Sequence, residues 1–184
     1  MMRSLISFLS ILLLSFVFSN SAIAQERAAE DPRLSPNAMV SQTIGTTVVT
    51  VTYGRPGVRD RVIFDADGLV PFGSIWRTGA DEATTISFSD DVRVEGELIE
   101  EGLYSLFTIP DEDSWTIIFN RVADQWGAYN YEEAEDVLRV QVDAEESHYM
   151  DQLMFYFEQI DEESGDMAIH WDNTKVNVSI EPAL

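Results

Sequence analysis

The sequence predicts an all-β fold, a single antiparallel β-sandwich of the jelly-roll or immunoglobulin-like type with about nine or ten strands. Three observations lead to this prediction. Short segments of alternating polar and apolar residues recur about every ten residues. Gly, Pro, Asp or Asn stand between these segments, as in turns. After the N-terminal region, no segment carries an apolar stripe at helical spacing. Short strands joined by turns are typical of antiparallel sandwiches.

The first clear strand pattern is TVVTVTY, in which Val49, Val51 and Tyr53 alternate with threonines. Successive side chains of a strand point to opposite faces, so these three residues are expected in the core. LMFYF and AIHW also read as strands. The same alternation predicts further inward-facing residues, namely Ile86, Phe88, Val92, Val94, Trp115, Ile117, Phe119, Leu138, Val140, Val142, Val176, Val178 and Ile180.

Three local patterns add detail to this strand series. The segment LYSLFTI, residues 103–109, reads as a strand whose two faces are both largely apolar. Glu95 and Gly96 predict a tight hairpin turn. The segment YEEAED, residues 131–136, predicts one short helical piece. We find no internal repeat, so the sequence predicts one domain.

The N-terminus has the features of an export signal. A positive charge at Arg3 precedes an apolar stretch, and Ala22 and Ala24 form a small-x-small cleavage site. The apolar stretch is shorter than the roughly 20 residues that span a bilayer. We therefore expect a periplasmic or extracellular protein with no membrane association after cleavage. The expected divisions are a signal peptide over residues 1–24, a flexible lead-in over 25–38 and the β-sandwich domain over 39–184.

The composition excludes several classes of partner and chemistry. The formal net charge is -22 and Lys175 is the single lysine, so neither nucleic acid nor anionic lipid is an expected partner. The chain has no cysteine, which excludes disulfides, thiolate chemistry and soft-metal sites. We find neither a dinucleotide fingerprint nor a phosphate-binding Gly-rich loop, and no cofactor is predicted.

Several segments together resemble a bacterial family of exported domains of unknown function. They are YGRPGVRDR (53–61), LVPFGSIWRTGADEATTISFSDDVRVEG (69–96), EGLYSLFTIP (101–110), WTIIFN (115–120), DVLRV (136–140) and HWDN (170–173). The Tyr-x-Arg-Pro and Trp-Arg-Thr-Gly-Ala motifs are the specific part of the resemblance. It implies an exported globular domain, sometimes attached to other modules, and no established activity. Asp81 departs from the pattern, since the resemblance leads us to expect Asn there.

Catalytic and metal-binding patterns are few. The only imidazoles are His148 and His170, and His170 stands in a strand pattern beside Trp171, which favours a structural, hydrogen-bonded role. A Ser-His-Asp triad assembled from distant segments stays open.

Two acidic patterns could form a catalytic site or a calcium site. Asp81 and Glu82 could serve glycoside hydrolysis, but adjacent strand residues point to opposite faces. In FDADG, Asp65 and Asp67 resemble the start of a calcium loop whose later ligands are missing, and a turn capped by Asp explains the pattern equally well. No metal site is predicted.

The tryptophans suggest a carbohydrate-binding alternative. Trp115 occupies a strand pattern and Trp171 another, which favours the core for both. Trp126 lies in a loop with Tyr129 and is the better candidate for an exposed indole. Stacking on a sugar ring would then depend on Trp76, Trp126 and Tyr129.

The main site hypothesis concerns an arginine cluster between residues 55 and 77. We expect Arg55, Arg61 and Arg77, with Trp76 and Glu82, to line one pocket that binds a small anionic ligand, because planar guanidinium groups suit carboxylates and phosphates. The structural alternative is equally specific. In it Arg77 pairs with Glu82 or Asp81 and Arg61 pairs with another acid, while Trp76 fills the core and Gly79 permits a tight turn. Ligand binding, hydrolysis and a purely structural or interaction role remain the three open classes.

Overall fold

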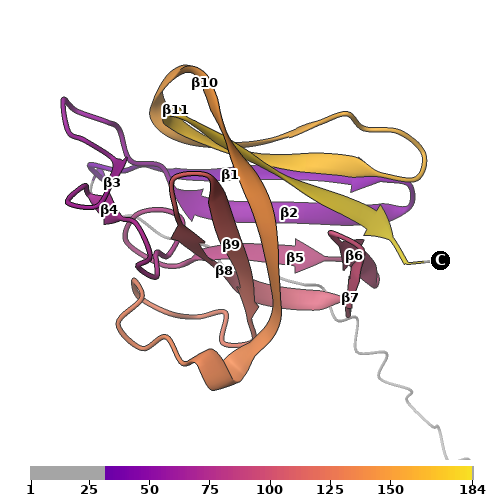
Figure 1. The fold of residues 1–184 in the computed structure, drawn as a ribbon. Helices are drawn as coiled ribbons and strands as arrows, with labels where there is room; N and C mark the ends of the chain where they lie inside the picture. Colours follow the sequence, from indigo (N-terminus) through magenta and orange to yellow (C-terminus); the bar gives the residue numbers. More distant parts are fainter. Residues whose placement is uncertain (1–31, 184) are drawn as a thin grey trace, which may run out of the picture.

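The structure, a computed structural model, describes residues 32–183 and confirms the all-β prediction (Figure 1). The predicted signal peptide, residues 1–24, lies outside the described residues, as does the lead-in up to residue 31. The strands are β1 (Asn37–Ile44), β2 (Thr47–Gly54), β3 (Phe64–Asp65), β4 (Val70–Pro71), β5 (Thr84–Phe88), β6 (Val92–Val94), β7 (Glu97–Ile99), β8 (Gly102–Pro110), β9 (Ser114–Asn120), β10 (Asp136–Glu158) and β11 (Gly165–Pro182).

Nine of these strands form one antiparallel sheet in the order β1-β2-β5-β8-β9-β10-β11-β6-β7. The sheet folds back on itself at β10, which joins one half, β1-β2-β5-β8-β9, to the other half, β11-β6-β7. The first part of β10 pairs with β9 from Asp136 to Asp143, and its second part pairs with β11 from Ala144 to Glu158. The ends of the order, β1 and β7, are not paired with each other, so the sandwich-like sheet is not closed. Figure 1 shows the long β10 ribbon crossing between the halves.

Two predicted strand pairs are single long strands in the structure. VLRVQV and LMFYF are both part of β10, and AIHW and KVNVSI are both part of β11. The bend in β10 coincides with shifts of register between Glu146, Met150 and Met154. Such bulges bend a strand without the Gly or Pro that would mark a break in the sequence. The sequence patterns also missed β1, an edge strand with a largely exposed face.

The smaller predictions are confirmed. Glu95 and Gly96 connect β6 to β7 with φ of 51° and 81°, the left-handed backbone of a two-residue hairpin turn. A single-turn 3-10 helix, Glu133–Glu135, lies within the segment predicted to be helical. β3 and β4 form a separate two-residue parallel pair at the end of the molecule where the loops gather (Figure 1).

Two apolar clusters explain why residues 103–109 are apolar on both faces. The main core lies between the halves of the folded sheet and includes Val49, Ile86, Leu106, Ile117 and Val178, all fully buried. A second cluster lies on the outer face of β8 and β9. It consists of Ala83, Phe107 and Ile118, with Ile75, Ile109, Ala128 and Tyr131 packed against them.

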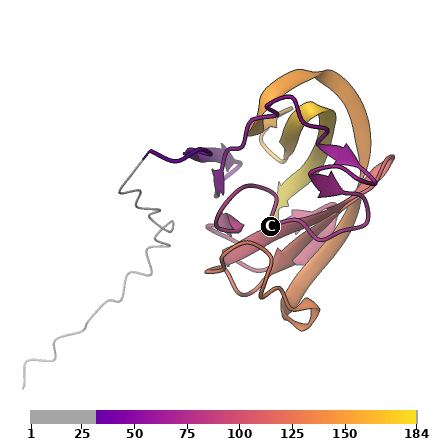
Figure 2. The ribbon, with the colours of Figure 1, turned by 90° about the vertical axis from the view of Figure 1, so that its left-hand side faces the viewer.

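In the part of the chain that is described, we find no helix with the length and apolar character needed to cross a membrane. The view in Figure 2 shows the described start of the chain entering at the side of the sheet where β1 lies.

Candidate functional site

The loop that carries Trp-Arg-Thr-Gly-Ala is fixed by hydrogen bonds along its length. We call residues 76–84 the motif loop. Trp76 and Thr108 exchange both backbone hydrogen bonds, at 2.8 and 2.9 Å, which docks the loop beside β8. The amide of Thr84 donates to the carbonyl oxygen of Arg77, and its hydroxyl donates to that of Thr78. The loop is therefore a rigid platform and holds its side chains in defined directions.

The backbone of the motif loop is strained. Thr78 has φ of 54° and Asp81 has φ of 63°. A β-branched residue such as Thr is rarely found in this left-handed region. Thr78 is fully buried, and its hydroxyl lies 3.2 Å from the hydroxyl of Thr108. Strained backbone that the surroundings hold in place is found preferentially at binding and catalytic sites, so this loop is the first place to look for function.

Trp76 belongs to the core and not to an open pocket. Its indole is 7% exposed and stacks on Trp171, with ring centroids 5.8 Å apart. Trp115 and Phe64 complete an aromatic cluster around it. The indole Nε1 of Trp76 donates to the carbonyl oxygen of Gly79. The predicted core positions of Trp115 and Trp171 are confirmed, and Trp76 fills the core as the structural alternative proposed.

Arg55 connects β2 to β10. Its Nε donates to the carbonyl oxygen of Leu153 at 2.9 Å, and its backbone amide donates to Pro36. The hydroxyl of Tyr53 accepts a hydrogen bond from the amide of Phe155 at 3.2 Å. The Tyr-x-Arg-Pro segment thus satisfies backbone groups beside the bend of β10.

Arg61 caps its own turn. Its guanidinium donates to the carbonyl oxygens of Val58 and Gly57, at 3.0 and 2.6 Å, and the residue is exposed. Its neighbour Arg59 donates to the carbonyl oxygen of Leu34. Both arginines are therefore engaged by backbone carbonyls.

Glu82 is paired, but with a residue that the sequence did not indicate. Arg33 donates to both of its carboxylate oxygens, at 2.6 and 2.9 Å. An oxygen of a second carboxylate group, that of Asp81, lies 4.0 Å from Nη1 of Arg33. Arg33 was predicted to lie in the flexible lead-in, whereas this contact and the start of β1 at Asn37 attach residues 33–37 to the domain. No signal in the sequence relates these two residues, which stand 49 positions apart.

Arg77 is the exception among the arginines. It faces the outer side of the sheet, because the register through Trp76 and Thr108 sets it opposite Phe107. Its Nε is buried and has no hydrogen-bond partner among residues 32–183. The predicted pairing of Arg77 with Asp81 or Glu82 does not form. The five predicted residues thus occupy different environments: Trp76 the core, Arg55 and Arg61 backbone carbonyls, Glu82 the ion pair with Arg33, and Arg77 the outer face.

A second loop lies over the same outer face. We call residues 121–131 the aromatic loop. It is joined to the motif loop by the hydrogen bond from Ala83 to the carbonyl of Gln125 and by that from Gly127 to the carbonyl of Asp81, at 2.9 and 3.0 Å. Trp126 is 57% exposed and Tyr129 is 84% exposed. The predicted exposure of Trp126 is therefore confirmed.

Side-chain hydrogen bonds fix the aromatic loop at Gln125 and at Tyr131. The buried amide of Gln125 donates to Asn120 and to the carbonyl of Val122. At the other end, the hydroxyl of Tyr131 donates to Asp136 at 2.6 Å, and Arg139 donates to both Asp136 and the Tyr131 oxygen. Burial raises the pKa of Tyr131 to about 12. The exposed rings thus stand on a loop with fixed ends.

The two histidines lie together without a nucleophile. His170 is fully buried, its Nε2 donates to the carbonyl oxygen of His148 at 2.9 Å, and its Nδ1 lies 3.4 Å from the hydroxyl of Tyr156. The ring centroids of the histidines are 4.7 Å apart. Burial lowers the pKa of His170. Within the described residues neither imidazole is hydrogen-bonded to a serine or threonine hydroxyl, and His170 has the structural role that its strand pattern favoured.

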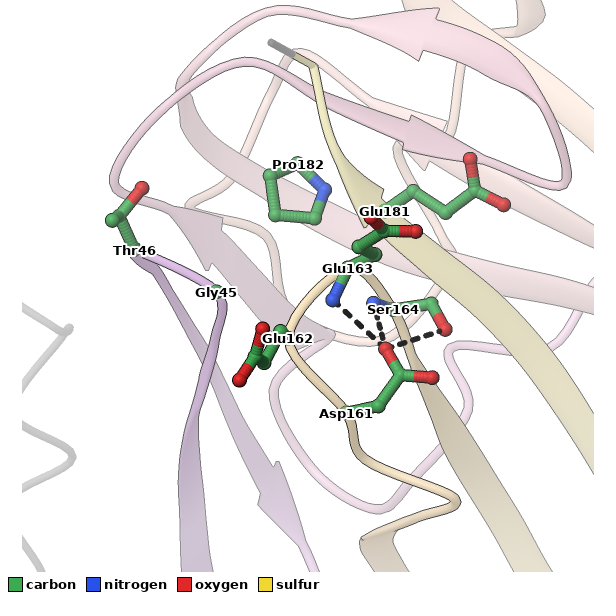
Figure 3. Close-up of a pocket in the computed structure, with 8 residues that line it drawn as sticks. All are labelled: Gly45, Thr46, Asp161, Glu162, Glu163, Ser164, Glu181 and Pro182. Carbon is green, nitrogen blue, oxygen red and sulfur yellow. Dashed lines mark hydrogen bonds between the residues drawn. The ribbon is translucent and has the colours of Figure 1, made fainter.

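Acidic residues surround the hollow drawn in Figure 3. It has a volume of about 470 Å³ and lies between the β1–β2 turn and the β10–β11 turn, with Asp161, Glu162, Glu163 and Glu181 in its lining. Asp161 points back into its own turn and accepts hydrogen bonds from the amides of Glu163 and Ser164, which lower its pKa. The carboxylate of Asp161 is therefore already engaged in hydrogen bonds that close the β10–β11 turn.

The possible calcium loop is a capped turn. The Oδ1 of Asp65 accepts a hydrogen bond from the amide of Asp67 at 3.3 Å, as the alternative explanation of FDADG expected. Over residues 32–183 there is no group of three or more His, Cys, Asp or Glu side chains arranged to hold a metal ion.

Comparison with known proteins identifies the family. Neither the curated proteins nor the solved structures gave a match. A family model described as a protein of unknown function, DUF2911, matches residues 35–180, which contain both the motif loop and the aromatic loop. The match agrees with the resemblance to a family of unknown function. The chain therefore belongs to the DUF2911 family.

Proposed function

We propose that this domain binds a small anionic ligand through Arg77 on the outer face of β8 and β9. The observation that carries the proposal is the unpaired guanidinium. Of the basic side chains in residues 32–183, every other one has a hydrogen-bond acceptor or an acidic partner. These are Arg33, Arg55, Arg59, Arg61, Arg93, Arg121, Arg139 and Lys175.

An unpaired guanidinium is unexpected in this chain. The formal net charge is -22, so acidic partners are abundant. A buried donor left without an acceptor costs about 1 to 3 kcal/mol, and more when the group is charged. The buried Nε is closed to a ligand, so an anion would accept hydrogen bonds from the terminal nitrogens of Arg77 and neutralise its charge. The partly exposed guanidinium can also donate to two oxygens at once, which favours planar carboxylates or phosphates.

The rigid motif loop supports the same proposal. A loop that is already ordered loses little conformational entropy when a ligand binds, so more of the contact energy appears as affinity. The strain at Thr78 is explained if the loop must present Arg77 in one direction. The hydrolase alternative has less support, because no serine or threonine hydroxyl contacts either imidazole in the described part of the chain.

Thermal unfolding in the presence of simple anions tests the proposal. The probes are sodium acetate, phosphate and sulfate at constant ionic strength, with chloride as the reference. At ten times its Kd, an anion stabilises the folded state by about 1.4 kcal/mol, which raises Tm by on the order of 3 to 6 °C. We expect at least one of the three to do so in the parent protein and in Arg93→Met, and none in Arg77→Met.

Arg93 is the matched control because its guanidinium donates to the carbonyl of Gly96 in the β6–β7 turn and takes no part in the motif loop. If none of the anions raises Tm of the parent relative to chloride, the proposal fails. It also fails if Arg77→Met retains the whole shift.

A further inference from the structure

We infer that the ligand is an acidic saccharide, whose carboxylate pairs with Arg77 while the apolar face of a sugar ring stacks on Trp126. This inference rests on the anion site proposed above and adds the chemical class of the ligand. It depends on the hydrogen bonds that join the motif loop, which carries the unpaired Arg77, to the aromatic loop, which carries the exposed Trp126 and Tyr129.

The two loops are close enough to share a ligand. The amide of Thr84 bonds to the carbonyl of Arg77, and the amide of Ala83 bonds to the carbonyl of Gln125. The segment 82–84 therefore contacts both Arg77 and the aromatic loop, so the two loops lie side by side. A short saccharide can contact both loops.

The aromatic rings are presented by a fixed backbone. Trp126 stands between the buried residues Gln125 and Gly127, and Glu82 forms a β-bridge with Trp126 itself. A Cβ atom at Gly127 would lie 2.9 Å from the ring of Tyr129, so this ring packs over the glycine backbone. Both rings are thus exposed on a loop that does not need to be ordered by a ligand.

The distribution of charge favours a ligand with one negative group on an otherwise neutral body. Arg77 supplies one unpaired cation, whereas Asp81 is a partly exposed carboxylate in the same loop. In a chain of net charge -22, a polyanion would meet repulsion away from Arg77. Sugar hydroxyl groups, in contrast, donate hydrogen bonds to carboxylates. A uronic acid residue combines the single carboxylate, the hydroxyl donors and an apolar ring face.

Titration calorimetry with uronate oligosaccharides tests this inference. The probes are otherwise neutral oligosaccharides that carry a single galacturonate or a single mannuronate residue, the methyl ester of the galacturonate compound as an uncharged match, and acetate. We expect at least one uronate to bind the parent tighter than acetate does, and the ester to bind more weakly than the acid. Trp126→Ala should weaken uronate binding on the order of tenfold and leave acetate binding unchanged. Arg77→Met should abolish both.

Tyr149→Ala is the control variant, because Tyr149 is an equally exposed aromatic residue on β10. Its uronate affinity should equal that of the parent. If neither uronate binds tighter than acetate, or if Trp126→Ala binds uronate as the parent does, the inference is wrong while the anion site still stands through acetate. If no anion binds at all, the proposed function fails with it.

Discussion

The Tyr-x-Arg-Pro segment, residues 53–61, and the motif loop, residues 76–84, differ in what their arginines bind. Both segments belong to one arginine cluster in the sequence. In the first segment, Arg55, Arg59 and Arg61 donate to backbone carbonyl oxygens. In the motif loop, the Nε of Arg77 has no acceptor. The first segment therefore uses its positive charges to hold β2, the N-terminal residues and β10 together. The second leaves the Nε of Arg77 without an acceptor in the described part of the chain, and we propose that an anion binds this residue.

The difference shows that clustering of arginines in a sequence does not indicate one site. The two segments are nevertheless mechanically joined. Gly54 ends β2, and its carbonyl oxygen accepts a hydrogen bond from Ala80 of the motif loop at 3.2 Å. The structural segment thus supports the loop that we propose to be functional.

The largest expected effect is at this junction. A Cβ atom at Gly54 would lie 2.1 Å from the carbonyl oxygen of Ala80, a contact that only movement of backbone can relieve. We expect Gly54→Ala to lower the free energy of unfolding by about 4 kcal/mol, measured by urea denaturation. Gly57→Ala is the control, since its nearest neighbours would be at 3.6 Å or more, and it should cost less than about 1 kcal/mol. Equal losses of unfolding free energy in Gly54→Ala and Gly57→Ala would show that Gly54 and Ala80 are not in close contact.

A second test compares the arginines directly. Arg55→Met removes the donor to the carbonyl of Leu153, which should cost about 1 to 3 kcal/mol. Arg77→Met removes no hydrogen bond, so its free energy of unfolding should stay within about 0.5 kcal/mol of the parent or rise. A loss of about 3 to 5 kcal/mol in Arg77→Met, the cost of breaking a buried ion pair, would make Arg77 structural and remove the contrast between the segments.

The smallest expected effect concerns a buried polar group outside both segments. The pKa of His170 is lowered in the folded protein, so the unfolded chain takes up this proton first as pH falls. Stability is therefore expected to decrease as pH falls below about 6.5, the ordinary pKa of histidine, and the loss is complete below the folded pKa. His148, Lys175 and Glu158 also act on this ring.

Urea denaturation at pH 7.5 and pH 5.5 measures this pH dependence, with His170→Gln as the comparison. The parent should lose more stability than the variant between the two pH values. An identical pH dependence in both proteins would assign the acid sensitivity to the carboxylates.

Much of the fold follows from side-chain period. Alternation located the buried residues of β2, β5, β9 and β11, because a strand with one face in the core must alternate. The apolar residues on both faces of the segment 103–109 are explained by two clusters, one on each side of β8. The alternation of polar and apolar side chains could not show that β10 is one strand, because its bend comes from bulges and not from a turn residue.

The site was less predictable because pairing across the fold is not written in local sequence. Glycine and tryptophan positions correctly suggested the tight motif loop, the core role of Trp115 and Trp171, and the exposure of Trp126. The capture of Glu82 by Arg33 joins residues 49 positions apart, and it could not be foreseen. Glu82, one of the two acidic partners expected for Arg77, is instead bound by Arg33.

By itself, the sequence determined an all-β chain, its buried faces, its turns, its acidic character and its membership of a family of unknown function. Tertiary structure alone decided which arginine is unpaired and which exposed aromatic residues lie on the loop that is hydrogen-bonded to its own. The physical reason is that burial and alternation are local properties of a strand, whereas a charge is satisfied by whichever acceptor the folded chain brings within hydrogen-bond distance. Here the fold brought Arg33 to Glu82, backbone carbonyls to Arg55 and Arg61, and no acceptor to the buried Nε of Arg77.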